Sequence, residues 1–409
     1  MAVFKPFRGV SPTRERASSV AAPPYDVVNT QEAAEIAEGN PLCFLRVARP
    51  EIELPPETDI HSDAVYAKAA ENYKRLKETA PLTQDDEARI YVYALTMDGR
   101  TQVGLVGAAS TADYNADVIK KHEKTREEKE DDRMAHIMAT RSHTGPVFLT
   151  YKDSDAVNAL VATTMEAAPN FDFTAPDGIT HRLWKTNTET SGKLSALFAE
   201  IPELYIADGH HRAAAASRVA KELAEKNPNH TGEEDYNFFL TVAFPAAQLR
   251  ILPYNRVTLD LNGLGKTEFL KAVENAGFAL SKADSPKAET TGDIRMYIDG
   301  EWYAIKSKKS APSDPAEALD VSVLQRGLLE PVLGIENPRT SNRIDFIGGI
   351  RGTVELERLV DSGKAAVAFS LYPVTVESLM AISDAGGIMP PKSTWFEPKL
   401  RDGLVCHDF

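Results

Sequence analysis

The residues best suited to chemistry lie in one short segment, 208–212, which reads Asp-Gly-His-His-Arg. Apolar residues 204–207 precede this segment and an alanine-rich run follows it, a pattern that predicts a strand, a tight turn and a helix. The start of a helix offers free backbone N–H groups, and a guanidinium can grip phosphate with two hydrogen bonds. We therefore predict a phosphate site made of Gly209, His210, His211 and Arg212.

Other features of this segment bear on its chemistry. Asp208 is expected at about the N-cap position of the predicted helix. His210 and His211 should point in different directions, so at most one of them is expected to face a pocket. A helix N-terminus favours a neutral imidazole that can exchange one proton. The competing interpretation is a helix capped by Asp208 whose histidines are solvated and bind nothing.

A second candidate lies in the charged segment 119–133. Most of this segment is typical of a solvated helix stabilised by ion pairs between residues i and i+4. His122 and Glu123 stand apart, because they follow the apolar pair Val118-Ile119 and should lie at the end of a strand or loop. A carboxylate in that place could act as a general base, provided that its pKa and its distance suit the proton to be moved.

Two proline-fixed loops complete the set of candidates. The loop 22–27 presents Tyr25 and Asp26, and a purely structural loop is an equally good interpretation. The loop 390–399 offers a lysine, two hydroxyl groups and aromatic neighbours, and it could close over an anionic ligand or form a packed tail. Its candidate residues are Lys392, Ser393 and Thr394.

Other chemistries are disfavoured by what the sequence lacks. It contains no Walker-type glycine motif, no Gly-x-Gly-x-x-Gly after a strand and no Gly-x-Ser-x-Gly. Cys43 and Cys406 have no metal-like spacing, so neither a disulfide scaffold nor a metal site is expected, and a reducing cytoplasm is the expected location. A zinc site built on His181 and the two histidines of segment 208–212 is also disfavoured.

The bulk properties narrow the class of protein. A chain of 409 residues with 43% hydrophobic and 26% charged residues predicts a globular protein of two or three domains. A net charge of −14 and a pI of about 5.2 would repel DNA. Apolar runs such as 365–371 are too short for a membrane span, and residues 1–6 lack the apolar core of a secretory signal. We expect no DNA or membrane partner.

Strand-like and helix-like patterns interleave along the whole chain, which predicts an α/β or α+β fold with a mixed sheet. Helices are predicted at 62–79, over most of 118–141, and at 212–226, 319–329 and 353–362. Strands are predicted at 146–151, 179–185, 204–207, 238–244 and 366–372, and hairpins at 89–108 and 294–305. We expect an N-terminal α/β region at 1–110, a core with the phosphate-binding turn at 111–250 and a C-terminal α/β region at 251–409.

At these residues the chain resembles the family called domain of unknown function 1015, which is often described as ParB-like. The matching stretches are 5–9, 22–27, 121–125, 206–212, 345–346 and 389–394. The resemblance implies a mixed-sheet core similar to that of the ParB and sulfiredoxin superfamily, with N-terminal and C-terminal elaborations. That superfamily includes free L-serine kinases, in which a Gly-His-His-Arg-like turn holds the donor phosphates and a glutamate takes the serine proton.

Carried onto this chain, the resemblance implies a small-molecule kinase that phosphorylates the hydroxyl of free L-serine. The donor would be ATP, ADP or pyrophosphate, used with Mg²⁺. Glu123 would be the base, with His122 and Asp208 beside the reaction centre. Lys392, Ser393 and Thr394 would add contacts to the donor, and Tyr25 or Asp26 would orient the acceptor. His210 stands where sulfiredoxin requires a cysteine, so sulfiredoxin chemistry is not expected.

Two other functions stay open at this point. The first is a ParB-like nucleotide sensor or partition-type protein that binds a nucleotide without turning over a small acceptor. The second is a phosphohydrolase, which would use water as the acceptor. A homodimer is also left open, and neither the donor nor the acceptor is fixed by the sequence.

Overall fold

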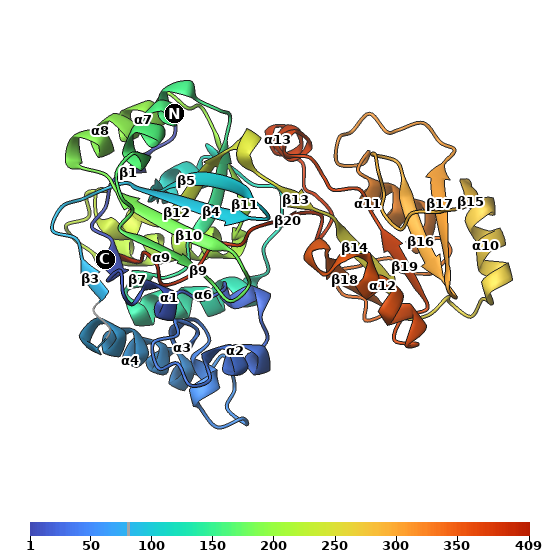
Figure 1. The fold of residues 1–409 in the computed structure, drawn as a ribbon, viewed down its shortest axis with the longest axis horizontal. Coiled ribbons are helices and arrows are strands. Elements are labelled where there is room, and N and C mark those ends of the chain that lie inside the picture. The colour runs from blue at the N-terminus through green and yellow to red at the C-terminus, as the bar shows by residue number, and fades with distance from the viewer. Residues whose placement is uncertain (80–81) are drawn as a thin grey trace. The chain divides into compact units, whose positions relative to one another are not determined.

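The computed structural model describes residues 1–79 and 82–409, which form two compact units (Figure 1). The first unit contains residues 1–249 together with 398–409, and the second contains residues 250–397. The division predicted after residue 250 therefore lies beside the observed one. The division predicted after residue 110 falls inside the first unit, because the strand that ends at Ser110 continues the main sheet of that unit.

The first unit is built on a nine-stranded sheet of order β6-β11-β8-β12-β5-β4-β10-β9, with β1 beside β5. Its strands are β1 (Phe4–Lys5), β4 (Tyr91–Met97), β5 (Arg100–Ser110), β6 (Ile119–Lys120), β8 (Val147–Tyr151), β9 (Phe171–Thr174), β10 (Thr180–Lys185), β11 (Leu204–Asp208) and β12 (Phe238–Pro245). The pairs β6–β11 and β8–β12 are parallel and the other pairs are antiparallel. The predicted mixed sheet is confirmed.

Helices cover this sheet, and most of its strands are apolar on both faces because they are buried. The longer helices are α4 (Asp63–Thr79), α6 (Glu127–Thr140), α7 (Asp155–Met165), α8 (Thr188–Phe198) and α9 (His210–Lys226). Helix α4 packs on α6, α6 packs on α9, and α7 packs on α8 (Figure 1). The small alanine side chains of α9 are buried, which allows close packing.

Several short elements complete the first unit. They are α1 (Ala17–Val20), α2 (Thr30–Ala37), α3 (Leu45–Ala48), α5 (Thr111–Asn115), β2 (Val10–Pro12), β3 (Leu82–Gln84), β7 (Ser142–His143) and β21 (His407–Asp408). The predicted helix at 62–79 and the hairpin at 89–108 are confirmed as α4 and β4–β5. The helix predicted within 118–141 begins only at Glu127, because residues 121–126 form a loop instead.

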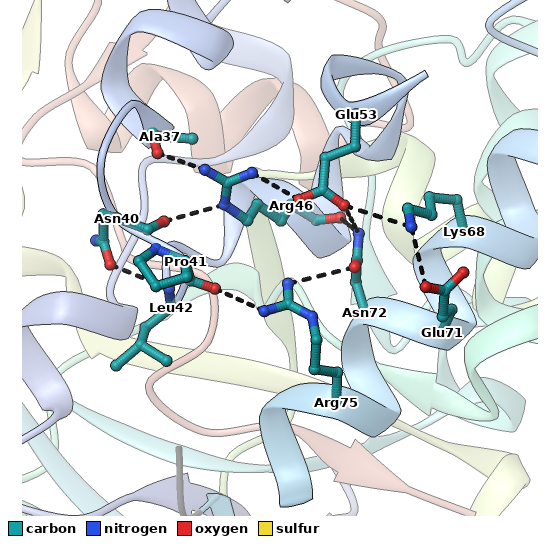
Figure 2. Close-up of polar contacts among 10 residues, drawn as sticks. All are labelled: Ala37, Asn40, Pro41, Leu42, Arg46, Glu53, Lys68, Glu71, Asn72 and Arg75. Atoms are coloured by element: carbon teal, nitrogen blue, oxygen red, sulfur yellow. Dashed lines mark hydrogen bonds and ion pairs between the residues drawn. The ribbon is translucent and has the colours of Figure 1, made fainter. Parts of the chain in front are cut away.

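A network of polar contacts joins α2 and α3 to α4 (Figure 2). Arg46 of α3 pairs with Glu53 at 2.6 Å and donates a hydrogen bond to the Ala37 carbonyl at 2.7 Å. Asn72 of α4 donates to Glu53 at 2.8 Å and to the Arg46 carbonyl at 2.7 Å. These helices and the loop that carries Tyr25 share one apolar cluster, so the network steadies the surface on which that loop packs.

The second unit has a six-stranded antiparallel sheet of order β15-β17-β16-β19-β14-β18. Its elements are β13 (Ile251–Leu252), β14 (Tyr254–Thr258), α10 (Lys266–Asn275), β15 (Phe278–Lys282), β16 (Ile294–Ile298), β17 (Glu301–Ser307), α11 (Asp320–Leu324), β18 (Ile344–Gly348), α12 (Gly352–Asp361), β19 (Val367–Ser370), α13 (Val376–Asp384) and β20 (Trp395–Phe396). The predicted hairpin at 294–305 is confirmed as β16–β17.

Among the helices that the structure describes, none combines the length and the apolar character needed to cross a membrane.

Candidate functional site

The parallel pair β6–β11 brings two separate sequence motifs to one edge of the sheet. Ile119 of β6 lies opposite Leu204 of β11, and both strands run in the same direction. The chain leaves β6 into the loop that carries Glu123 and leaves β11 into the turn at Gly209. Ligands of such sheets commonly bind beyond the carboxyl ends of the strands, so this edge is the natural place for a site.

Gly209 is the residue on which the turn depends. It is the N-cap of α9 and has φ 95° and ψ 30°, a left-handed conformation that favours glycine. The expectation that Asp208 caps the helix is therefore wrong, because Asp208 is still the last residue of β11. Gly209 has no side chain with which to cap the start of α9, and a helix start is a favourable place for an anion.

His210 is buried and contacts the loop that carries Glu123. Its Nε2 accepts a hydrogen bond from the His122 backbone N–H at 3.4 Å, and its Nδ1 lies 3.9 Å from Oε2 of Glu123. Burial, reinforced by the neighbouring imidazole of His122, holds the pKa of His210 well below its usual range. The ring is thus neutral, and since Nε2 is an acceptor, we assign the proton to Nδ1, on the side of Glu123.

His211 holds the same loop at a second point. Its Nε2 accepts a hydrogen bond from the Arg126 backbone N–H at 3.1 Å. The two consecutive imidazoles therefore fasten residues 122–126 to the first turn of α9. Both were predicted as phosphate ligands; the structure places each Nε2 against a backbone N–H, and their part in phosphate binding stays a prediction.

His122 is buried beside His210, with ring centroids 4.4 Å apart and an interplanar angle of 85°. Burial lowers the pKa of His122 to about 4, although Asp208 acts in the opposite direction. Its Nδ1 has no hydrogen-bond partner among the described residues. At neutral pH the side chain is an uncharged ring, so it adds no positive charge to the site.

Arg212 is buried against the turn at Gly209. Its guanidinium donates to the Pro146 carbonyl and lies 3.4 Å from a carboxylate oxygen of Asp208 and 3.6 Å from one of Asp26. Burial lowers the pKa of Arg212. The two carboxylates raise it by more, and Asp26 has the larger effect of the two, so the pKa of Arg212 is raised overall. The predicted bidentate hydrogen bond from Arg212 to phosphate would therefore compete with the carboxylates of Asp208 and Asp26, which already neutralise this cation.

The loop 22–27 does reach the turn, as the structure shows for both of its candidate residues. Asp26 lies beside Arg212, and the ring of Tyr25 lies 3.9 Å from the Arg133 guanidinium carbon. Burial raises the pKa of Tyr25, so its hydroxyl stays protonated at neutral pH. The two residues begin a 3₁₀ turn, Tyr25–Val27.

Asp402 and Lys399 were missed by the sequence reasoning, and both come from the C-terminal segment that returns to the first unit. Lys399 Nζ lies 3.5 Å from Asp208. Asp402 exchanges backbone hydrogen bonds with Ala22, and its side chain is 2% exposed. Burial, to which the charge of Asp26 adds, raises the pKa of Asp402 to about 7.

A small cavity of about 30 Å³ lies within this charged cluster and is lined in part by Tyr25, Arg133, Arg212 and Asp402. A space of that size holds about one water molecule. It is therefore too small for an amino acid. Asp208 and Glu123 do not line it, and both are half-buried.

The remaining predicted donor contacts lie in the second unit. Ser393 is buried there, and its hydroxyl donates to the Pro390 carbonyl at 2.7 Å. Lys392 is exposed and has φ 56°, and Thr394 is half-buried. Their role in donor binding stays a prediction.

Across residues 1–79 and 82–409, no group of three histidine, cysteine, aspartate or glutamate side chains is arranged to hold a metal ion. The carboxylates of Asp26, Asp208 and Glu123 lie near the turn, and Asp208 is close to two cations, Arg212 and Lys399.

Comparison with solved structures finds remote similarities. A mutant form of a free serine kinase in complex with AMP is 13% identical, with a TM-score of 0.37 over 68% of this chain and 84% of that one. A conserved hypothetical protein from Pyrococcus furiosus is 13% identical, with a TM-score of 0.36 over 70% of this chain and 90% of that one. SbnI from Staphylococcus aureus, with a C-terminal truncation, is 12% identical, with a TM-score of 0.36 over 73% and 85%.

Comparison with curated proteins finds no match. A family model described as "Protein of unknown function (DUF1015)" matches residues 4–322, which is most of the chain. The protein therefore belongs to the DUF1015 family.

Proposed function

We propose that this protein is a phosphotransferase that moves a phosphoryl group from a nucleotide or pyrophosphate to the hydroxyl of a small acceptor, with free L-serine as the leading candidate. One observation carries the proposal. The carboxylate of Glu123 lies 3.9 Å from His210, which is the first residue of a helix whose N-cap, Gly209, has no side chain. A general base and an anion-binding helix start are thus neighbours.

Phosphoryl transfer suits this arrangement because it demands positioning and charge stabilisation more than covalent catalysis. The donor phosphates would lie against the backbone N–H groups at the start of α9. Lys399 and Arg212 add positive potential there, although each is within 3.5 Å of Asp208. ATP, ADP and pyrophosphate share the phosphate chemistry that this end of the helix would recognise.

Glu123 would act on the acceptor. As the acceptor oxygen bonds to phosphorus, the bond from phosphorus to the donor's leaving phosphate breaks, and the hydroxyl proton passes to the Glu123 carboxylate. His210 and His211 hold the loop that carries Glu123, so they are positioning residues in this scheme. Tyr25 and Asp26 would orient the acceptor beyond the turn.

Mg²⁺ fits this scheme only as an ion held largely by the donor. The carboxylates near the turn, those of Glu123, Asp208 and Asp26, could supply the one or two protein ligands that are usual when Mg²⁺ binds phosphate oxygens and water. When bound, the ion would neutralise phosphate charge.

Phosphorus NMR of the purified protein with Mg²⁺, L-serine and each donor in turn tests the proposal. We expect a phosphoserine signal with at least one donor. Release of free phosphate alone would instead make the protein a phosphohydrolase. Nucleotide binding without any turnover would make it a sensor, and in either case the proposal is wrong.

Glu123→Gln separates catalysis from binding. We expect phosphotransfer to fall by about 10²–10⁴-fold, the usual contribution of a general base, while donor binding persists. Glu127→Gln is the matched control, because Glu127 is exposed in the first turn of α6 and outside the loop that the histidines hold. Equal losses in the two variants would contradict the role of Glu123.

A further inference from the structure

The second unit contains a cavity of about 360 Å³ that has no part in the chemistry proposed above. Small-molecule sites commonly have volumes of about 300–1,000 Å³, mostly apolar walls and a few well-placed polar groups. This cavity matches that description. Its walls come from β14, from the segment that ends in α11, from the segment between β19 and α13, and from the loop that carries Ser393.

Arg256 of β14 is a buried cation on the wall of this cavity. This strand lies next to the edge strand β18, and the residue is 2% exposed. The guanidinium donates to the carbonyls of Tyr254 and Pro391, the latter at 3.1 Å, and it faces the ring of Phe346 at 5.2 Å. No carboxylate pairs with it in the described chain, and burial without a counter-charge lowers the pKa of Arg256 to about 9.

Asp320 is a buried carboxyl group on the same wall and is 8% exposed. It accepts a hydrogen bond from the Gly292 backbone N–H at 2.7 Å. Burial, with a smaller contribution from the charge of Asp293, raises the pKa of Asp320 to about 6, even though the hydrogen bond from Gly292 works against this. Asp320 and Arg256 line one space without pairing with each other or with any other described residue of opposite charge.

Two opposite buried charges that do not pair are costly, since buried charges are normally paired. A ligand that carries a carboxylate and an ammonium group would supply both missing partners. Arginine binds carboxylates with two parallel hydrogen bonds, which makes it the natural receptor for the anionic end. Glu377 also lines the cavity and adds negative charge for the cationic end.

The other walls indicate what the rest of the ligand would be. They include the apolar side chains Leu319, Val321, Leu371, Val374 and Ala381. The hydroxyl groups of Thr375 and Ser378 bond to each other at 3.1 Å, and Thr375 caps α13. The wall therefore offers contact area to an apolar group and few free polar groups to hydrate it.

The motif 389–394, which the family resemblance singled out, belongs to this cavity. Pro391 provides one of the two carbonyls that hold Arg256, and Ser393 lines the space directly. The motif was predicted to contact a phosphate donor. Its contacts in the second unit fix the guanidinium of Arg256 at the wall.

We propose that this cavity binds a free α-amino acid with an apolar side chain, whose carboxylate pairs with Arg256 and whose ammonium group pairs with Asp320. The inference does not depend on the proposed phosphotransfer, because it concerns other residues in the other unit.

Isothermal titration calorimetry of the full chain with a panel of free amino acids tests the inference. We expect at least one apolar amino acid to bind with a dissociation constant of about 1 mM or tighter. Its amide, which lacks the carboxylate, should bind at least about 10-fold more weakly, and so should the analogue without the amino group. The absence of binding by every amino acid, or equal binding of the amide, would overturn the inference without any variant.

Arg256→Met and Asp320→Asn locate the binding. Arg256→Met should abolish amino-acid binding. Asp320→Asn should weaken the binding of the amino acid but leave the affinity for the analogue without the amino group unchanged. Arg343→Met is the matched control, because Arg343 pairs with Asp260 and does not line the cavity. Circular dichroism checks that each variant is folded. If Arg256→Met does not fold, the comparison of the amino acid with its amide on the wild-type protein tests the role of the carboxylate.

The same titrations distinguish this inference from the proposed function. Glu123→Gln should leave the heat of binding unchanged even though it removes phosphotransfer. Binding that survives Arg256→Met but disappears in Glu123→Gln would place the amino acid in the first unit, and the inference would be wrong. If the wild-type protein shows no phosphotransfer, the inference about the cavity in the second unit still stands.

Discussion

Replacing Gly209 by alanine should disturb the start of α9 in two separable ways. The residue has φ 95°, and a left-handed backbone costs an ordinary L-residue roughly 1–2 kcal/mol. An added Cβ would also lie 3.0 Å from Nε and 3.1 Å from Cζ of Arg212. The guanidinium cannot retreat freely, because it is held by the Pro146 carbonyl and lies beside Asp208 and Asp26.

The expected cost is the sum of these two effects. Loosening one charge-assisted hydrogen bond of Arg212 adds about 1.5–3 kcal/mol to the backbone strain, so Gly209→Ala should destabilise the first unit by roughly 2.5–5 kcal/mol. Gly99→Ala is the matched control. Gly99 has φ 75° in the β4–β5 turn, and no atom lies within 4 Å of its added Cβ, so this variant carries the backbone strain alone.

Hydrogen exchange measured on peptides from β11 and α9 provides the assay, because it reports local opening within the first unit. Gly209→Ala should raise the exchange rate there by more than Gly99→Ala raises it in the β4–β5 hairpin. A second readout is the affinity for nucleotide, which should fall only in Gly209→Ala. Equal effects of the two substitutions on stability would refute the argument that Arg212 fills the space beside Gly209.

Three further predictions concern other parts of the first unit. Glu123→Gln should abolish measurable phosphotransfer yet leave the calorimetric affinity for donor unchanged, and a parallel loss of affinity would argue for a structural role. Arg46→Met removes one partner of the partly buried Glu53 and leaves it Asn72 and Lys68, so the melting temperature should fall by an amount equivalent to about 1–3 kcal/mol, and an unchanged value would show that the Arg46–Glu53 contact contributes nothing. The pKa of His122 is about 4 in the folded protein and 6.5 ordinarily, so the unfolded chain binds the extra proton and stability should fall by up to about 3 kcal/mol between pH 6.5 and 4. Across that range the melting temperature should depend less on pH in His122→Gln than in the wild type. An equal pH dependence in the two proteins would contradict the low pKa of His122.

The sequence predicts well those elements whose evidence is local. Helix α4 and the hairpin β4–β5 follow from their periodicity and from the Asp-Gly turn, and both are confirmed. Helices α7 and α8 were not predicted, although Ser154 and Asn187 cap them and gave a usable signal. The N-cap of α9 was placed one residue early, because the left-handed preference of glycine after Asp208 was not taken into account.

The assembly of the site depends on non-local pairing, which one sequence does not reveal. Strand β6 has only two residues, and its parallel pairing with β11 is what brings Glu123 to the turn. Asp402 and Lys399 reach the site from the C-terminal segment, which looked like a part of the last region of the chain. No local pattern marks a single aspartate as buried beside Arg212, so only the fold can identify it.

The two histidines show why residue type alone did not fix the roles within the site. Imidazoles at a helix start predicted direct contact with phosphate through a neutral ring. Burial keeps His210 neutral, and a neutral ring can accept the backbone N–H of His122 at Nε2. Since the same ring cannot be both this acceptor and a cation, the anchoring of the Glu123 loop excludes a charged His210. In the proposed phosphotransfer, the positive potential for phosphate would therefore come from the backbone of α9 and from cations such as Lys399.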